Sequence, residues 1–354
     1  MIGASPGQDA RTLEAVARAA LRAWDIPGDL DLALLKYREN AVFAIHIRGE
    51  PTYVLRIHRR GYHSDAALYS ELEWMISLAD QGIPTPRVIP TASGDILTLA
   101  RDPNGSDAYQ CDLLSWVAGA TLGHIEERSF GDPEFIGRAY KQVGRLAARL
   151  HAHSAQWRPA ATFNRHSWDE MGCLAKPGVW GYFGDLHTLS DAERARLHGG
   201  AEMARRRLRS FGKLANRFGL IHGDLVPENV LIDGNQCTLI DFDDCGFGWY
   251  VAEIATAVFF QLGTPSFVPA LHAMVAGYRQ VRALDETELG MLDVMLFLRA
   301  MALLGWIQTR AETDTARKIR PMVTELSLAL AARLSGDSTA KLADLDAALA
   351  STTR

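Results

Sequence analysis

The chain has 354 residues, 48% apolar and 22% charged, which is ordinary for a soluble globular protein and long enough for two lobes. Its formal net charge of −5 argues against nucleic acid as the main partner. The four cysteines are scattered and form no C-x-x-C pair. They therefore indicate a reducing compartment, and neither a disulfide framework nor a zinc site.

The sequence predicts a cytoplasmic protein that does not act on a membrane. The N-terminal stretch MIGASPGQDARTLEAV lacks the basic-then-apolar run of a signal peptide. A membrane span needs roughly 18 uninterrupted apolar residues, and the best candidates are interrupted by Glu253 and Arg299.

The first part of the chain predicts a helix, a hairpin, a second helix and further strands. Apolar residues recur at helical spacing in residues 10–24. On both sides of Gly49 they alternate with polar residues, which is typical of a β-hairpin. Residues 64–82 follow as a helix, and strands are expected around residues 96–100 and 109–116.

The second part of the chain is predicted to be mainly helical, with a short β-region at its centre. Helical patterns cover residues 134–154 and 201–219, and an irregular segment between them reads as an insertion or substrate-shaping segment. Short strands and turns follow, and then apolar helices. We expect an α+β fold in which residues 1–114 form a small β-rich lobe and residues 115–354 a larger helical lobe.

The stretch GLIHGDLVPENVLIDGNQCTLIDFDDCGFGWY, residues 219–250, places carboxylates and an amide at the ends of short apolar runs. A two-strand β-unit of this kind brings Asn229 and Asp241 to the same end as Asp224. One carboxylate and one amide oxygen suit Mg²⁺, which takes its other ligands from water and phosphates. Asp224 could then accept the proton of an attacking hydroxyl, as phosphoryl transfer requires. The competing interpretation is a set of solvated turn carboxylates.

The run H-G-D-L-V-P-E-N followed by D-F-D resembles the signature of the aminoglycoside phosphotransferase and choline kinase-like branch of the protein-kinase-like superfamily. Type II homoserine kinases, hydroxylysine kinases and stress-response Ser/Thr kinases belong to the same branch. The resemblance implies a two-lobed fold with a small antiparallel sheet in the first lobe, and ATP and Mg²⁺ as cofactors. It implies Asp224 as catalytic base, Asn229 and Asp241 as metal ligands, and His222 as a brace of the catalytic loop.

The resemblance also implies a cation on the third strand that binds the ATP phosphates. No Lys occurs between Lys36 and Lys141, and Arg56 takes the expected position. A guanidinium is permanently charged and can bond phosphate or carboxylate through two N–H groups. Its expected partner is Glu71 on the following helix, with Glu73 as the competitor.

Further nucleotide contacts are expected in the first lobe. A Gly-rich phosphate loop is missing, and Asn40 stands in the turn where backbone N–H groups could cap the phosphates. Adenine is expected against residues 111–117, with hydrogen bonds near Ser115 and Val117.

Three residues depart from the family pattern. Val226 stands two residues after Asp224, where protein kinases carry Lys and antibiotic kinases often carry His, so a γ-phosphate contact would have to come from elsewhere. Asp243 replaces the Gly of D-F-G and adds a carboxylate beside the metal. Glu253 replaces an Asp that bonds the catalytic loop in relatives, and a structural role is expected for it.

Two sets of residues could bind the acceptor. An acidic rim of Asp243, Asp244 and Asp185 suits an amine-bearing alcohol, and aromatic faces attract such cations. The aromatic candidates are Trp180, Tyr182, Trp249, Tyr250 and Trp306, for each of which core packing is the competing interpretation. Arg299 and Arg310 could instead bind a carboxylate, which would indicate an amino-acid-like acceptor.

The predicted function is ATP-dependent transfer of the γ-phosphate to a hydroxyl of a small, amine-bearing molecule of the aminoglycoside, choline, homoserine or hydroxy-amino-acid type. One alternative is a bacterial Ser/Thr protein kinase of the stress-response type, which the lack of an A-P-E activation segment disfavours. Another is a nucleotide-binding pseudokinase, which the intact Asp224, Asn229 and Asp241 disfavour. Nothing in the sequence indicates an oligomeric state.

Overall fold

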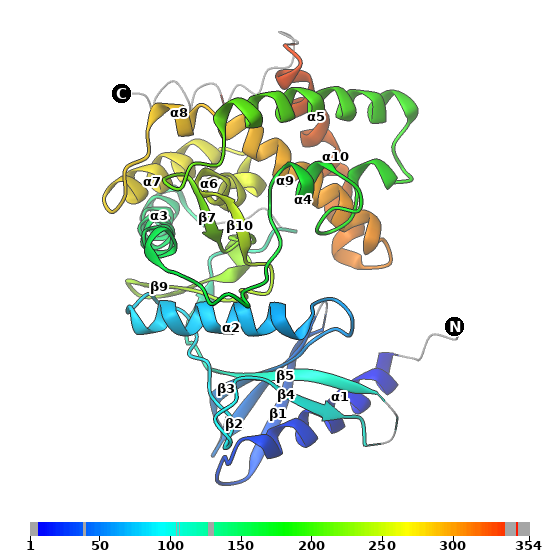
Figure 1. The fold of residues 1–354 in the computed structure, drawn as a ribbon, viewed down its shortest axis with the longest axis vertical. Coiled ribbons are helices and arrows are strands. Elements are labelled where there is room, and N and C mark those ends of the chain that lie inside the picture. Colours follow the sequence, from blue (N-terminus) through cyan, green and yellow to red (C-terminus); the bar gives the residue numbers. More distant parts are fainter. Residues whose placement is uncertain are drawn as a thin grey trace. The chain divides into compact units, whose positions relative to one another are not determined.

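The computed structural model describes residues 6–37, 40–103, 105, 107–126, 131–336 and 345. The chain forms two compact units, which are shown in Figure 1. Unit 1 comprises Met1–Ala118 and Pro159–Asn164, and unit 2 comprises Gly119–Arg158 and Arg165–Arg354. The sequence placed the boundary at residue 114 and did not foresee that the chain returns to unit 1 inside the segment predicted to be irregular.

Unit 1 is built on a five-stranded antiparallel sheet with the strand order β1-β2-β3-β5-β4. In chain order its elements are α1 (Pro6–Ala20), η1 (Leu21–Ala23), β1 (Leu30–Tyr37), β2 (Ala41–Ile47), β3 (Glu50–Ile57), α2 (Asp65–Asp80), β4 (Thr98–Arg101) and β5 (Ala108–Ser115). The predicted hairpin and both predicted helices are confirmed. Strand β1 was not predicted, because it is a largely exposed edge strand without a strong apolar pattern.

The alternation of β3 separates an apolar face of the sheet from a charged one. Leu55 and Ile57 lie in the core that α1 forms with the sheet, together with Phe43 and Ile45 of β2. Because successive side chains of a strand point to opposite faces, Arg56 points away from that core and toward α2. The strand thus places one buried cation on the opposite face.

Unit 2 is mainly helical and contains two small antiparallel sheets, β7–β10 and β6–β8–β9. Its helices are α3 (Pro133–Gln156), α4 (Glu170–Leu174), η2 (Phe183–Asp185), α5 (Asp191–Phe211), η3 (Pro227–Asn229), α6 (Tyr250–Val258), η4 (Phe259–Gln261), α7 (Phe267–Arg279), α8 (Glu286–Leu289), α9 (Leu292–Thr309) and α10 (Asp314–Leu334). Its strands are β6 (Ala120–Thr121), β7 (Phe218–Ile221), β8 (Val230–Asp233), β9 (Gln236–Leu239) and β10 (Gly246–Trp249).

Helix α5 differs from its prediction at both ends. It begins at Asp191, where Ser190 and Glu193 form a capping box, and ends at Phe211. Gly212 stops it by adopting a φ of 72°, a left-handed conformation that glycine reaches without strain. The sequence had placed this helix over residues 201–219, because its first half lies in the segment rich in Gly and His.

Helix α9 is the core helix of unit 2. Within the described ranges it alone is long and apolar enough to cross a membrane, but 78% of it is buried inside the protein. It packs against α10, α6, α5 and α4, as Figure 1 also shows. Two charged residues, Asp293 and Arg299, lie on it and are buried.

Helices α3 and α7 approach closely enough for backbone contact. A Cβ added to Gly144 of α3 would collide with the carbonyl oxygen of Met274, and one added to Gly277 of α7 with that of Lys141. Glycine at both positions therefore sets the spacing of the two helices.

We expect Gly144→Ala to lower the free energy of unfolding by about 1–3 kcal/mol, because backbone atoms cannot move aside as a flexible side chain can. Gly137 lies on the same helix and has open space around its Cβ position. Gly137→Ala is the control and should stabilise the helix by about 0.5–1 kcal/mol. Urea unfolding measures both, and equal effects of the two variants would contradict the close approach.

Candidate active site

The loop after β7 is held at its backbone and at the His222 side chain. His222 is fully buried, and its Nε2 lies 2.9 Å from the carbonyl oxygen of Ile240. Its Nδ1 accepts from the backbone N–H of Asp224 at 3.4 Å, so the proton belongs on Nε2. His222 thus connects Asp224 with the residue before Asp241, as expected of a brace.

Both carboxylate oxygens of Asp224 accept hydrogen bonds from side chains. Arg299 of α9 donates to Oδ1 through Nη2 at 2.6 Å. Asn229 donates to Oδ2 at 2.9 Å, and the same amide nitrogen reaches the Asp224 carbonyl oxygen at 2.9 Å. Because its nitrogen points at Asp224, the amide oxygen of Asn229 is directed elsewhere. The carboxylate is therefore fixed from two sides.

Strand pairing brings Asn229 and Asp241 to the same end of β8 and β9, as the sequence predicted. Val230 pairs with Leu239, and the N–H of Ile240 donates to the Asn229 carbonyl oxygen at 3.0 Å. Asp241 follows directly, with a φ of 64°. A non-glycine residue in that conformation is strained, and such residues cluster at functional sites.

Four carboxylates gather around this end of the β-unit. Desolvation, followed by the charges of Asp243, Asp224 and Asp241, raises the pKa of Asp244 well above its usual range, although the Trp180 indole lowers it. A cluster with this excess of negative charge suits a divalent cation. Among the described residues no three His, Cys, Asp or Glu side chains form a metal site by themselves.

The segment after α3 fastens the turn that follows Asp241, a role that the sequence did not reveal. Arg165 donates to the carbonyl oxygens of Asp243 and Cys245. Trp168 donates to the carbonyl oxygen of Asp244 at 2.8 Å, and the Trp180 indole donates to the Asp244 carboxylate at 2.8 Å. Three successive carbonyl groups of the turn are thus bound. The only signal in the sequence was a concentration of Trp and His.

Two features hold the loop that carries Asp224 in place next to the turn after Asp241. Gly223 has a φ of 81°, and a Cβ there would collide with the Asp244 carbonyl oxygen and the Trp168 indole. Glu253 of α6 accepts from the N–H groups of His222 and Gly223, at 3.0 Å each. Burial raises the pKa of Glu253 to about 7, against the lowering effect of these two bonds. Its contacts agree with the expected structural role.

In unit 1 the structure pairs Arg56 with Glu71, as the sequence predicted, and adds a second carboxylate. Nη1 of Arg56 donates to Glu71 at 2.7 Å, while Nε and Nη2 bind the two oxygens of Asp112 at 2.9 and 2.8 Å. Asp112 lies opposite Arg56 in the β3–β5 register, and His58 contacts it at 2.6 Å. Burial raises the pKa of Asp112, but Arg56 and then His58 outweigh burial and lower it overall.

The other predicted nucleotide residues of unit 1 make contacts of their own. The Asn40 side chain accepts from the backbone N–H of Arg59 at 3.2 Å, and so joins the start of β2 to the end of β3. The Ser115 hydroxyl and N–H both bond to the backbone of Arg87. Val117 lies two residues beyond β5. Ser115 is therefore poorly placed to bind a base through its N–H group, which corrects that expectation.

The five aromatic side chains predicted to line an acceptor site have partners within the chain. Trp249 is fully buried, and its indole donates to the Gly212 carbonyl oxygen at 2.8 Å, so it is a core residue. Every one of the five candidate rings already faces a cation of this chain at 4.5 to 5.9 Å. The pairs are Trp180 with Arg299, Tyr182 with Lys176, Trp249 with Lys213, Tyr250 with Arg282, and Trp306 with Arg310.

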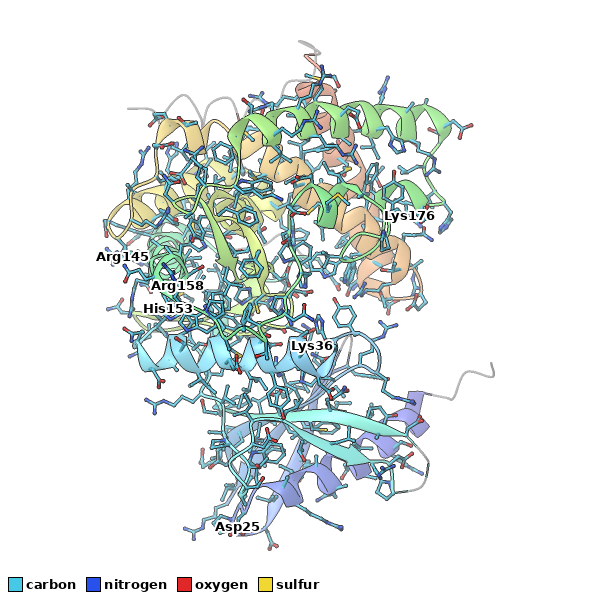
Figure 2. The ribbon with its side chains drawn as sticks, viewed as in Figure 1. Asp25, Lys36, Arg145, His153, Arg158 and Lys176 are labelled. Carbon is cyan, nitrogen blue, oxygen red and sulfur yellow. The ribbon has the colours of Figure 1, made fainter. Side chains whose placement is uncertain are left out.

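Two charged acceptor candidates also have partners within the chain. Asp185 pairs with Lys176, which is labelled in Figure 2, at 2.9 Å. Arg299 pairs with Asp224 at 2.6 Å. Of the predicted acidic rim, Asp243 and Asp244 remain beside Asp224 and Asp241.

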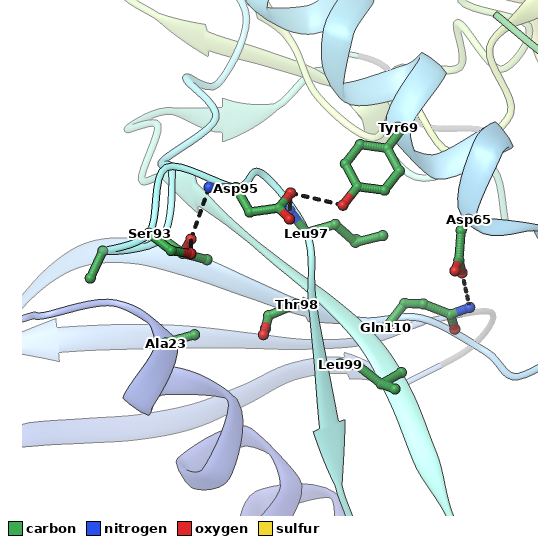
Figure 3. A pocket seen from close by; sticks show the side chains of 11 residues that line it. Ala23, Asp65, Tyr69, Ser93, Asp95, Leu97, Thr98, Leu99 and Gln110 are labelled. Carbon is green, nitrogen blue, oxygen red and sulfur yellow. Dashed lines mark hydrogen bonds between the residues drawn. The ribbon is translucent and has the colours of Figure 1, made fainter. Parts of the chain in front are cut away.

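Figure 3 shows a pocket of unit 1 that contains none of the predicted site residues. Tyr69 donates to Asp95 at 2.8 Å along one of its walls, and Gln110 donates to Asp65 at 2.7 Å along another. The pocket offers no cation to a phosphate group. It is therefore unrelated to the Arg56 network.

The fold and the site define a protein-kinase-like phosphotransferase. A solved structure of a microcompartment-associated aminopropanol kinase superposes with a TM-score of 0.80 at 30% identity, over 92% of this chain and 99% of that one. The model of the phosphotransferase enzyme family matches residues 33–288, and the chain belongs to this family. It is an ATP-dependent small-molecule kinase.

Two further relatives are amicoumacin kinases. The amicoumacin kinase of Bacillus subtilis strain 168 is 24% identical over 288 residues, which are 78% of this chain and 80% of that protein. A solved amicoumacin kinase in complex with AMP-PNP, Ca²⁺ and Ami has a TM-score of 0.72 at 18% identity, and covers 93% of this chain and 96% of that one. The latter likeness is one of fold.

We expect Arg56→Lys to destabilise the protein, although it keeps the charge. An ammonium cannot bind both oxygens of Asp112 and also reach Glu71 as the guanidinium fork does. Leaving a buried carboxylate without its partner lowers the free energy of unfolding by about 3–5 kcal/mol. Urea unfolding of the variant would measure this loss. Arg60→Lys is the control, because the Arg60–Asp107 pair is exposed and should matter little. A stable Arg56→Lys variant would show that the bidentate pair is dispensable.

We expect Glu253→Gln to lower the free energy of unfolding by about 1–3 kcal/mol and to slow phosphotransfer. An amide has a single oxygen, so one of the two loop N–H groups would lose its acceptor. Glu288→Gln is the matched control, because that buried glutamate accepts one backbone bond in a capping box, where Gln also serves. Identical stability and rates for Glu253→Gln and wild type would refute the bracing role.

Proposed function

We propose that this kinase transfers the γ-phosphate of ATP to the hydroxyl of a small, amine-bearing alcohol, with Asp224 as the catalytic base. The observation that carries the proposal is the fixed Asp224 carboxylate beside Asn229 and Asp241. A base held at both oxygens has one orientation, and preorganisation of this kind is what phosphoryl transfer asks of a protein.

In the proposed reaction the acceptor hydroxyl gives its proton to Asp224, and its oxygen forms a bond to the γ-phosphorus. The bond from the γ-phosphorus to the β–γ bridging oxygen breaks, and its electron pair leaves with ADP. A positioned base contributes roughly 10²–10⁴-fold to the rate. The brace from His222 and the two bonds from Glu253 keep the loop from drifting during the transfer.

Asn229 and Asp241 would hold Mg²⁺, through the amide oxygen that points away from Asp224 and through the strained carboxylate. When bound, the ion neutralises charge on the phosphate groups of the nucleotide. Asp243, whose charge raises the pKa of Asp244, would add negative charge near it. The AMP-PNP and Ca²⁺ of the solved amicoumacin kinase support a nucleotide with a divalent cation.

Arg56, held by Glu71 and Asp112, would bind the phosphates of ATP, and Asn40 would keep the neighbouring turn in place. Because the N–H groups of Ser115 and Trp116 bond within unit 1, Val117 is the better candidate for a backbone bond to adenine. The cytoplasm, where ATP is abundant, suits this reaction.

Carboxylates, and not aromatic rings, would recognise the acceptor amine. Asp243 is the proposed anchor, because the five candidate rings already face internal cations. The aminopropanol kinase supports an amine-bearing acceptor. A screen of ATP consumption with amino alcohols, with the matching alcohols that lack the amine as controls, tests this class. Equal turnover of both series would overturn it.

We expect Asp224→Asn to reduce kcat by at least about 10²-fold while the Kd for ATP stays within a few-fold, because the amide cannot accept the proton.

Asp241→Asn should instead weaken the Mg²⁺-dependent part of nucleotide binding. Calorimetric titrations of ATP with and without Mg²⁺ separate the two roles. An Asp224→Asn variant that turns over at the wild-type rate would exclude Asp224 as the base.

A further inference from the structure

The loop that carries Asp224 lacks a cation of its own. Val226, two residues after the base, is an aliphatic side chain that is 4% exposed. Its N–H bonds to the Asp224 carbonyl oxygen at 2.8 Å, which fixes the turn. A positive charge for the transferring group, besides Mg²⁺ and Arg56, would therefore have to come from an element outside this loop.

Arg299 of α9 brings a buried positive charge to Asp224 from outside the loop. Its side chain is 7% exposed, and Nη2 lies 2.6 Å from Asp224 Oδ1. The guanidinium carbon lies 4.7 Å from the centre of the Trp180 ring, and the Trp180 indole is fixed by Asp244. The Arg299 guanidinium is thus held by the Trp180 ring against one of its faces and by Asp224 at one of its edges. These two contacts restrict its orientation.

One N–H group of Arg299 is buried without an acceptor. Nε and Nη2 form a single edge of a guanidinium, as in Arg56, where the two atoms bind both oxygens of Asp112. In Arg299 the same edge makes only the Nη2 bond to Asp224 Oδ1, while Asn229 donates to Oδ2. Among the described residues, no group accepts from Arg299 Nε.

A buried N–H group without an acceptor lowers stability by roughly 1–3 kcal/mol. We therefore infer that this N–H group, next to the proposed catalytic base, binds a ligand atom. The ligand atom must be an oxygen that lies beside Asp224 Oδ1. The proposed reaction brings two such oxygens there, that of the acceptor hydroxyl and those of the phosphoryl group. Only the phosphoryl oxygens carry the full negative charge that a guanidinium binds most strongly.

We propose that Arg299 binds an oxygen of the transferring phosphoryl group through its Nε–H, while Nη2 orients Asp224. This proposal rests on the proposed function. It thereby supplies from helix α9 the cation that position 226 lacks. Arg299 makes and breaks no covalent bond. It stabilises negative charge on the phosphoryl group as that group moves from ADP to the acceptor.

The test uses Mg²⁺-ADP with aluminium fluoride, a mimic of the transferring phosphoryl group, on the full-length protein without acceptor. We expect wild type to bind ADP more tightly when aluminium fluoride is present. Arg299→Gln should lose at least about tenfold of this gain while the Kd for ADP alone is unchanged. Removing one donor of this kind also lowers kcat by about 10²–10³-fold, and the KM for the acceptor should change little.

Two variants guard against a purely structural effect. Arg299→Lys keeps the positive charge but has no side-on pair of donors, so it should fold, contact Asp224 and recover only part of the gain. Arg207 pairs at 2.8 Å with Asp293, which lies on α9 as Arg299 does. This ion pair does not include Asp224. Arg207→Ala should lower the melting temperature and leave the aluminium fluoride gain intact.

An Arg299→Gln variant that keeps the full aluminium fluoride gain would overturn the proposal. So would a loss confined to the KM for the acceptor, which would assign Arg299 to the acceptor instead. Failure of the proposed function itself would look different, because wild type would then show no Mg²⁺-dependent ADP binding and no ATP turnover. Loss of the gain in Arg299→Gln, with Arg207→Ala unaffected, would establish the phosphoryl contact.

Discussion

The geometry of the loop that carries Asp224 depends on hydrogen bonds to its carboxylate and to the peptide groups before it. Asp224 accepts from Arg299 on one oxygen and from Asn229 on the other, and the peptide groups before it are bound by Glu253. Each partner comes from a different element: α9, η3 and α6. A loop of a few residues thus takes its geometry from the packing of the helices, and the helices must be packed correctly for the proposed base to be oriented.

Unit 1 also buries a charged side chain, Arg56, and pairs it with carboxylates. An arginine at position 56 has three donor groups to satisfy where a lysine would have a single ammonium, and Asp112 on the neighbouring strand matches its fork. Asp112 is thus a second carboxylate for Arg56 besides Glu71, and His58 lies against it at 2.6 Å. Buried ion pairs of this kind are costly to break, which ties the sheet to α2.

The sequence was informative where local pattern decides the structure. The strand ends that carry Asn229 and Asp241 and the hairpin that carries Arg56 follow from periodicity and spacing. The Arg56–Glu71 pair was implied by the family resemblance. The contacts of Arg299, Asp112 and Arg165 could not be predicted, because each depends on which distant elements meet in space. The cations beside the aromatic candidates could not be predicted for the same reason.

The turn that follows Asp241 has a consequence for control of the enzyme. Arg165 and Trp168 bind its carbonyl groups at three consecutive residues, and the Trp180 indole holds the side chain of Asp244. Switchable kinases depend on a mobile segment at this point, which swings between an inhibited and a competent arrangement. Here such a swing would have to rupture four bonds at once. The four bonds thus hold the turn in one arrangement and oppose any regulation that would require it to move.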